Sequence, residues 1–369
     1  MVAQQKAFRA WAHFARASLR ALTGVWRRSA PHGGAGTEMS AREGRDRFDA
    51  RATAGDVLLA PGAPWAHPDY ASLIDRHRSR RGLRFALLVY DLAPLRHPEW
   101  FDRGLVRLFR AWFKDLLPVC DHVFAISQAT AADVEAYARE QAVTLPTAVV
   151  PIPIGTDLSL ASGDAGTRRG ERLPSIGSYA LIVATIEIRK NHLLLFRVWR
   201  RLLKELPRER VPTLVFAGRV GWLVDDLMQQ IANTDYLDGK LQIIENPSDE
   251  ELAALYSGCL FTLFPSLYEG WGLPVTESLS FGKPCFISNR TSLPEAGGGL
   301  ARSFDPDDLR DAYDKIRTVL EDRAELQRWG EEVSREFRPV PWSAAVEALL
   351  TGLGVPLAAP QPSDAQRAA

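Results

Sequence analysis

The sequence predicts an α/β protein with two domains, each built around a parallel, doubly wound sheet. The chain has 369 residues, of which 46% are apolar, and this is enough to bury two separate cores. Short continuous apolar runs recur along it, and such runs are typical of strands buried on both faces. Single helices are expected between these runs, which is the pattern of a parallel sheet with crossover helices.

The composition narrows the classes of function. The chain carries 45 basic and 45 acidic residues, so its net charge gives no reason to expect a nucleic-acid partner. Its three cysteines are far apart and form no disulfide or zinc pattern, which favours a reducing cytoplasm. No apolar run reaches the roughly 18 residues that cross a bilayer. A cytoplasmic protein is therefore expected, either free or peripheral on the inner face of the cell membrane.

The N-terminal segment predicts an amphipathic helix. Within residues 1–30, apolar side chains recur at spacings of three and four: Phe8, Trp11, Ala15, Leu19, Leu22 and Trp26. Six basic residues lie in residues 6–28, and no acidic residue precedes Glu38. This pattern fits a helix that contacts an anionic membrane. It fits equally a core helix of the first domain with a basic outer face.

The first domain is predicted to span residues 1–158. Its expected elements are strands at 85–90 and 122–126, a helix at 128–139 and an extended segment at 147–155. The first of these strands delivers Asp91 at its carboxyl end. Ser127 follows the second strand and is the expected N-cap of the helix.

A polar stretch at residues 159–178 predicts a linker, and the second domain is predicted to span residues 179–340. Its strands are expected at 180–184, 213–217, 241–244, 259–264 and 284–287, with helices near 191–206, 221–233, 248–257, 273–282, 306–320 and 324–336. Ligands of such sheets bind beyond the carboxyl ends of the strands. A closing helix in residues 341–355 is expected to pack back on the first domain. Residues 356–369 are expected to form a disordered tail.

One loop of the second domain has the features of an anion site. The stretch FPSLYEGWGLPVTE follows an apolar strand, and a helix is expected to begin at about Leu273. Gly270 and Gly272 let the backbone approach a ligand closely, and the free N–H groups of the first helical turn favour a phosphate. Glu269 and Glu277 can then accept hydrogen bonds from hydroxyls on opposite sides of a bound diphosphate. The alternative, two merely solvated glutamates, accounts less well for the glycines between them.

This stretch resembles the E-x7-E signature of the family-4 (group 1) glycosyltransferases. Four further segments resemble theirs in the same order: ATIEIRKN at 184–191, LVFAG at 214–218, SDEELAALY at 248–256 and SNRTSLPE at 288–295. In the first domain, three segments resemble those of mannosyltransferase-like bacterial members: VYDLAPLRHP at 89–98, DHVFAIS at 121–127 and PIPIGTD at 151–157. An ordered set of this kind is far more specific than a lone motif.

The resemblance implies the GT-B fold, with two Rossmann-like domains and a nucleotide-sugar donor bound to the second. It assigns Arg189 and Lys190 to the donor diphosphate, where they would stabilise the charge of the leaving group. Glu277 is expected to bind the ribose, and Glu269 the transferred sugar. The backbone near the diphosphate comes from Gly270, Trp271, Gly272 and Leu273. Asp91, which could also be a simple turn residue, completes the candidate catalytic set.

The resemblance further implies a retaining hexosyltransferase that needs neither a cofactor nor a metal. The donor would be GDP-mannose or a UDP-sugar, with mannose favoured, and the acceptor a saccharide or a polyprenyl-linked saccharide. The Asp305-Pro-Asp307 triplet mimics a metal-binding motif, but it precedes an amphipathic run, so capping of a helix by Asp305 is predicted instead. Two rivals stay open: a truncated nucleotide-binding pseudoenzyme that serves as a partner subunit, and a phosphorylase or epimerase on the same fold.

Three departures from the family pattern stand out. Tyr90 occupies a position where many members have His, and Thr185 one where many have Arg. Diphosphate binding must therefore rest on Lys190 with Arg189. The family also begins with a strand and a glycine-rich loop that face the cleft between the domains, and no such strand is found before the N-terminal helix. The first domain is therefore expected to lack its usual first strand.

Overall fold

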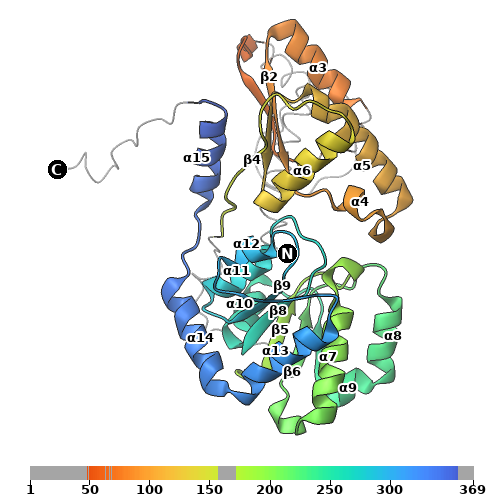
Figure 1. Cartoon of the computed structure of the whole chain (residues 1–369), viewed down its shortest axis with the longest axis vertical. Helices are drawn as coiled ribbons and strands as arrows, with labels where there is room; N and C mark the ends of the chain where they lie inside the picture. Colours follow the sequence, from red (N-terminus) through yellow and green to blue (C-terminus); the bar gives the residue numbers. More distant parts are fainter. Residues whose placement is uncertain are drawn as a thin grey trace, which may run out of the picture.

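The computed structural model describes residues 48, 50–62, 64, 65, 67, 69–156 and 172–355. Four predictions from the sequence lie outside these residues: the N-terminal basic helix, the absence of a first strand, most of the linker and the C-terminal tail. The described residues form two α/β domains, and each has a sheet of parallel strands (Figure 1). The α/β fold class is confirmed.

The first sheet has four parallel strands in the order β1-β2-β3-β4. They are β1 (Val57–Ala60), β2 (Arg84–Val89), β3 (His122–Ala125) and β4 (Val150–Pro151), and the helices beside them are α3 (Tyr70–Arg81), α4 (Ala93–Arg96), α5 (Arg103–Leu116) and α6 (Gln128–Glu140). The two predicted buried strands correspond to β2 and β3. Strand β1 and helices α3, α4 and α5 were not predicted. The side chain of Ser127 accepts a hydrogen bond from the amide of Thr130, which confirms it as the N-cap of α6.

Alternate residues of β2 enter two different cores, as the pleat of a strand requires. Phe85 and Leu87 pack on one face of the sheet in a cluster that includes Phe113 of α5. Ala86 and Leu88 lie on the other face, where the described residues that cover it include Leu349 from the far end of the chain. Both faces of this short strand are therefore buried, which explains its continuous apolar sequence.

The second sheet has six parallel strands in the order β10-β9-β8-β5-β6-β7. They are β5 (Tyr179–Val183), β6 (Thr213–Ala217), β7 (Leu241–Ile244), β8 (Phe261–Phe264), β9 (Cys285–Ser288) and β10 (Arg302–Phe304). The first five correspond to the predicted strands, and β10 was missed. Strand β5 lies between β8 and β6, so the order of the strands reverses there. Such a reversal opens a crevice at the carboxyl end of the strand, where ligands of doubly wound sheets bind.

The helices of the second domain include one correction to the sequence analysis. They are α7 (His192–Glu205), α8 (Asp225–Asn233), α9 (Asp235–Gly239), α10 (Asp249–Gly258), α11 (Leu273–Ser280), α12 (Leu293–Gly297), α13 (Leu309–Glu321) and α14 (Arg323–Glu336). The prediction that Asp305 caps α13 is wrong. Asp308 is the N-cap, because its carboxylate directly precedes the helix and accepts from the amides of Arg310 and Asp311. The carboxylate of Asp305 instead accepts from the amide of Asp307.

The last helix, α15 (Trp342–Gly352), leaves the second domain and stands beside β4 of the first (Figure 1). The two chain segments that join the domains are bonded to each other at this crossing. The amide of Thr156 donates to the carbonyl of Val340 at 2.8 Å, and the amide of Val340 donates to the Thr156 hydroxyl at 3.0 Å. Trp342 lies so close to Gly155 that a side chain there would overlap the indole. Within the described residues, no helix is long and apolar enough to cross a membrane.

Candidate active site

A cavity of about 450 Å³ lies between the two domains. Its lining includes Leu88, Tyr90, Asp91 and Ile126 from the first domain, Val183, Thr185, Glu187, Arg189, Lys190, Arg219 and residues 269–274 from the second, and Trp342 from α15. The cavity therefore opens at the carboxyl ends of β2 and β5. This is the position that the strand order of the second sheet predicts for a ligand.

The charged side of the cavity begins with the turn that follows β5. Residues Ile188–Lys190 form a single 3-10 turn, and Asn191, with a φ of 55°, then leads into α7. Arg189 and Lys190 are thus held at the N-terminus of a helix, where the helix dipole disfavours positive charge. Two such cations are stable there only with anions close by.

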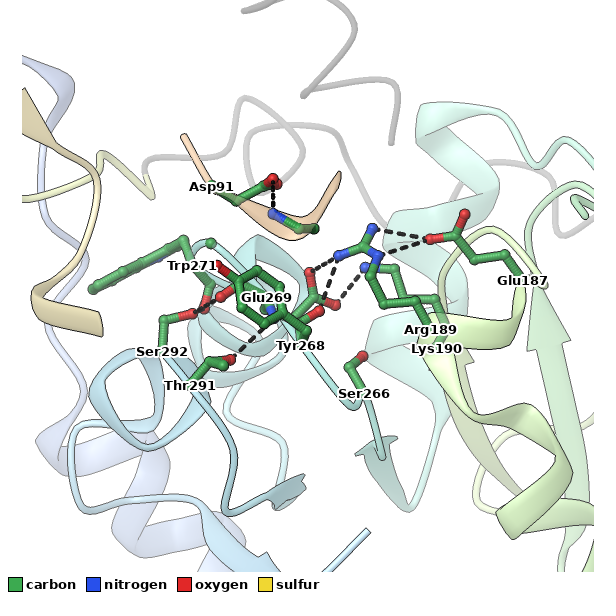
Figure 2. A network of polar contacts seen from close by, with 12 residues as sticks. Asp91, Glu187, Arg189, Lys190, Ser266, Tyr268, Glu269, Trp271, Thr291 and Ser292 are labelled. Atoms are coloured by element: carbon green, nitrogen blue, oxygen red, sulfur yellow. Dashed lines mark hydrogen bonds and ion pairs between the residues drawn. The ribbon is translucent and has the colours of Figure 1, made fainter. Parts of the chain in front are cut away.

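Two carboxylates supply that negative charge (Figure 2). Glu269, from the loop after β8, accepts from Arg189 Nη1 at 2.9 Å and forms an ion pair with Lys190 Nζ. Glu187, with 2% of its side chain exposed, lies on the other side of the guanidinium and accepts from Arg189 Nη2 at 2.9 Å. The four side chains form one largely buried chain of alternating charge. Buried side chains keep their charges only when they are paired in this way, because burial of an unpaired charge is costly.

The same contacts set the protonation states. Burial of the Glu269 carboxyl would raise its pKa, but Lys190 and Arg189 outweigh burial and lower the pKa to about 2. Burial and the nearby Arg189 lower the pKa of Lys190. Glu269 is therefore ionised throughout the neutral range. A ligand that reaches Arg189 and Lys190 meets cations already paired with the protein's own carboxylates.

Asp91 lies at the end of β2, as predicted, and lines the cavity. Its carboxylate accepts a hydrogen bond from the amide of Ala93 at 3.0 Å, which holds it in the turn before α4. Burial raises the pKa of Asp91, and the positive charge of Arg189 acts in the opposite direction. The structure thus brings Asp91 into the same cavity as Arg189, Lys190 and Glu269.

The glycines of the loop after β8 meet the other domain. A Cβ atom on Gly270 would lie 2.1 Å from the carbonyl oxygen of Tyr90, so only glycine permits this contact. The Thr130 hydroxyl donates to the carbonyls of both Gly270 and Tyr90 at 3.3 Å. Gly272 has a φ of 106° and is the N-cap of α11, which begins at Leu273, as predicted. The sequence analysis expected a ligand to approach the backbone closely at Gly270. In the structure, the backbone of the first domain makes this close approach.

A second loop, which follows β9, holds this one in place and was given no role in the sequence analysis. The amide of Glu269 donates to the Thr291 hydroxyl at 3.0 Å, and the Ser292 hydroxyl bonds the carbonyls of Glu269 and Trp271 (Figure 2). Thr291 has a φ of 49°, which is costly for a β-branched residue. The only signal for these residues was the resemblance of SNRTSLPE to a family loop.

Glu277 is the one candidate residue that does not line the cavity. It lies on α11 with 3% exposure, and its carboxylate accepts a hydrogen bond from the Tyr256 hydroxyl at 2.8 Å. The remaining backbone candidates, Gly270, Trp271, Gly272 and Leu273, do line it. The E-x7-E pair is therefore split in the described structure, with one carboxylate at the cavity and the other turned into the domain core.

The Asp305-Pro-Asp307 triplet has other partners. Arg290 forms ion pairs with Asp305 at 3.0 Å and with Asp307 at 2.8 Å. Across the described ranges, no group of three or more His, Cys, Asp or Glu side chains is placed to hold a metal ion.

Comparison with known proteins agrees with this fold. The family model described as glycosyl transferases group 1 matches residues 167–335. The serotype-specific mannosyltransferase WbdA of Escherichia coli is 28% identical over 83% of this chain, which spans only 37% of that relative. The O-antigen chain mannosyltransferase B of Escherichia coli is 28% identical over 70% of this chain and 68% of its own length.

Solved structures show the same fold at low sequence identity. HepE of Anabaena, solved with UDP, has a TM-score of 0.58 at 16% identity and covers 81% of this chain and 78% of its own. Sucrose-phosphate synthase of Thermosynechococcus elongatus has a TM-score of 0.57 at 20% identity, over 84% of this chain and 75% of its own. Over residues 167–335 this chain is thus similar to the group 1 glycosyltransferases, and it has the GT-B fold of these solved structures.

Proposed function

We propose that this chain is a retaining glycosyltransferase that moves a hexose from a nucleotide-diphosphate sugar to a saccharide or a polyprenyl-linked saccharide. One observation carries the proposal: Arg189 and Lys190 line the cavity at the carboxyl end of β5, where the strand order reverses. The relatives named as mannosyltransferases favour mannose, with GDP-mannose or a UDP-sugar as the donor.

The chemistry needs positive charge at the leaving group. When the bond between the anomeric carbon and the phosphate oxygen breaks, its electron pair stays on the nucleoside diphosphate. Lys190 and Arg189 would stabilise this charge in a site already shielded from water. Because both cations contact Glu269 in the described structure, the diphosphate must take over that contact. Glu269 would then be free to accept hydrogen bonds from hydroxyls of the transferred sugar.

Retention of the anomeric configuration would follow from attack on the same face as the leaving phosphate. In this proposal the acceptor hydroxyl passes its proton to the departing phosphate oxygen, and no carboxylate forms a bond to the sugar. Glu269 is therefore not assigned as a nucleophile, and its proposed role is to accept hydrogen bonds from hydroxyls of the transferred sugar. Glu277 as a ribose ligand and peripheral binding to an anionic membrane through residues 6–28 stay predictions from the sequence.

The test is a transfer assay on the full chain. GDP-mannose and a panel of UDP-sugars are each offered with oligosaccharide acceptors and with a polyprenyl-linked saccharide, and the released nucleotide and the glycosylated product are quantified. Thermal shifts with the same nucleotides report binding separately, because ligand binding raises the melting temperature. Transfer from one donor, with an α-linked product from an α-linked donor, is the expected result. Binding without turnover would indicate a pseudoenzyme, and sugar release with inorganic phosphate alone a phosphorylase.

A further inference from the structure

Tyr268 belongs to the second domain by sequence, but its side chain is buried in the first. It follows β8 in the loop that carries Glu269, and only 4% of the residue is exposed. Its ring packs in a small cluster with Ala93 and Trp100, and it meets the ring of His97 edge-on at 5.5 Å. A residue of the donor-side loop is thus inserted between α4 and the neighbouring turn of the opposite domain.

The hydroxyl of Tyr268 is fully engaged there. It donates to the carboxylate of Asp133 on α6 and accepts a hydrogen bond from the amide of Leu92 at 3.3 Å. Asp133 is itself held by Arg96 at 3.4 Å. A buried hydroxyl with both a donor and an acceptor partner fixes the ring in one position, since leaving either partner unpaired is costly.

The backbone of the same residue belongs to the ion-pair network. The Tyr268 carbonyl accepts from Arg189 Nη1 at 3.0 Å, and the next residue is Glu269, which pairs with Arg189 and Lys190 (Figure 2). Tyr268 therefore contacts the first domain through its side chain and Arg189 of the ion-pair network through its backbone.

We propose that Tyr268 is a positioning residue that couples closure of the two domains to the placement of Glu269 and Arg189. When the domains are closed, its ring is anchored between Leu92 and Asp133, and the adjacent backbone is held. When the domains separate, the ring leaves its pocket. The Tyr268 carbonyl and Glu269 are then no longer held in position by the first domain. The cations would then be correctly aimed at a donor diphosphate only in the closed form. The expected effect on turnover rests on the proposed function, whereas the expected effect on domain closure does not.

Other contacts also cross the junction without reaching the ion-pair network. The carboxylate of Glu295, on α12, accepts a hydrogen bond of 2.9 Å from the amide of Gln128 at the start of α6. This bond spans the same two domains, and Glu295 is not among the residues that line the cavity. It provides a matched control, because E295Q weakens a bond between the domains while leaving Tyr268, Glu269 and Arg189 unchanged.

The kinetic experiment compares Y268F, Y268A, D133N and E295Q in the full chain. Y268F keeps the ring and loses only the hydroxyl, so it is expected to fold normally. We expect kcat to fall on the order of tenfold in Y268F and D133N, with less than about a threefold change in KM for the donor, because the reacting groups are misplaced rather than removed. The double variant Y268F/D133N should lose no more than either single variant, and E295Q should retain kcat within about twofold.

A second measurement does not depend on turnover. Small-angle scattering should give a larger radius of gyration for Y268A than for the wild type and E295Q, and Y268F should lie between them. If the wild-type protein transfers no sugar, the proposed function is wrong. The scattering result still shows whether Tyr268 holds the two domains in the closed form. Unchanged kcat and unchanged radius of gyration in Y268A would overturn the inference. A loss of kcat in Y268F that E295Q matches would assign the effect to the junction in general and would also overturn it.

Discussion

Burial disfavours the charge of Lys190, and the ion pair with Glu269 opposes this effect. Burial and Arg189 both lower the pKa of Lys190, and the direct ion pair with Glu269 acts in the opposite direction. In the proposed function, Glu269 pairs with Lys190 and Arg189 until a donor diphosphate replaces it. This arrangement makes the two residues informative targets for substitution.

Replacement of Lys190 by Ala should lower kcat/KM for the donor on the order of a hundredfold, because the leaving diphosphate loses a cation that would stabilise its charge. The measurement is steady-state transfer with the donor varied. Lys204, an exposed lysine on α7, is the matched control, and K204A should keep wild-type kinetics. Equal kinetics for K190A and the wild type would remove Lys190 from the donor site.

Replacement of Glu269 by Gln tests the ion pair through its effect on stability. The pKa of Glu269 is lowered in the folded protein from 4.5 to about 2, so ionisation of this carboxyl stabilises the fold above pH 4.5 and this contribution is lost as the pH falls toward 2. At pH 7 we expect E269Q to lose about 3 kcal/mol in the free energy of unfolding, measured by urea denaturation.

The difference between wild type and E269Q should then shrink as the pH is lowered from about 5 to about 3. E209Q, at an exposed position, should change the unfolding free energy by less than about 0.5 kcal/mol. A difference that stays constant across this pH range would show that the carboxylate is not paired in the folded protein.

At the scale of elements, α15 matters because it covers a face of a sheet in the other domain. Its Leu349 is 5% exposed and packs in the cluster with Ala86 and Leu88 of β2. The helix is thus part of the core of the first domain, although it follows the second in the chain. Its loss would expose one face of β2 and weaken the support of the strand that ends at Asp91.

Leu349 and Val346 on the same helix provide a matched pair. L349A should cost about 2–4 kcal/mol in the unfolding of the first domain, because it removes buried methyl groups and leaves a cavity. Val346 is 50% exposed, and V346A should cost less than about 0.5 kcal/mol. The measurement is thermal or urea unfolding followed by circular dichroism. Equal losses in the two variants would mean that α15 does not pack against β2 in solution.

The elements were predictable from sequence to the extent that local patterns define them. The apolar runs of β2 and β5 identify strands because both faces of each are buried. Strand β10 has only three residues, two of them polar, so no run marks it. The separation of Glu269 from Glu277 could not be predicted either. The spacing of residues places Glu277 on a helix, but it does not show that the hydroxyl of Tyr256 donates to its carboxylate.

At the scale of the whole molecule, the candidate site exists only where the two domains meet. The first domain contributes Asp91, the second contributes Arg189 and Lys190, and α15 contributes Trp342. Such contacts between distant segments leave no periodic signal in the sequence, and only the ordered resemblance to a family indicated them. The hydrogen bonds of Thr291 and Ser292 to the backbone of Glu269 illustrate the same limit. The local sequence of two loops does not show that they contact each other in the folded protein.

The last prediction concerns how the whole cavity neutralises a diphosphate. In many sites a divalent cation spans the phosphate oxygens. Here Arg189 and Lys190 line the cavity beside the N-terminal turn of α11, and together they can provide the charge that such an ion would supply. We therefore expect transfer to continue at the full rate after dialysis against EDTA, measured with the preferred donor and acceptor. The double variant D305N/D307N should also keep this rate, because both carboxylates pair with Arg290. Loss of activity in EDTA that manganese restores would contradict the prediction, and if D305N/D307N also lost activity, that triplet would be the metal site.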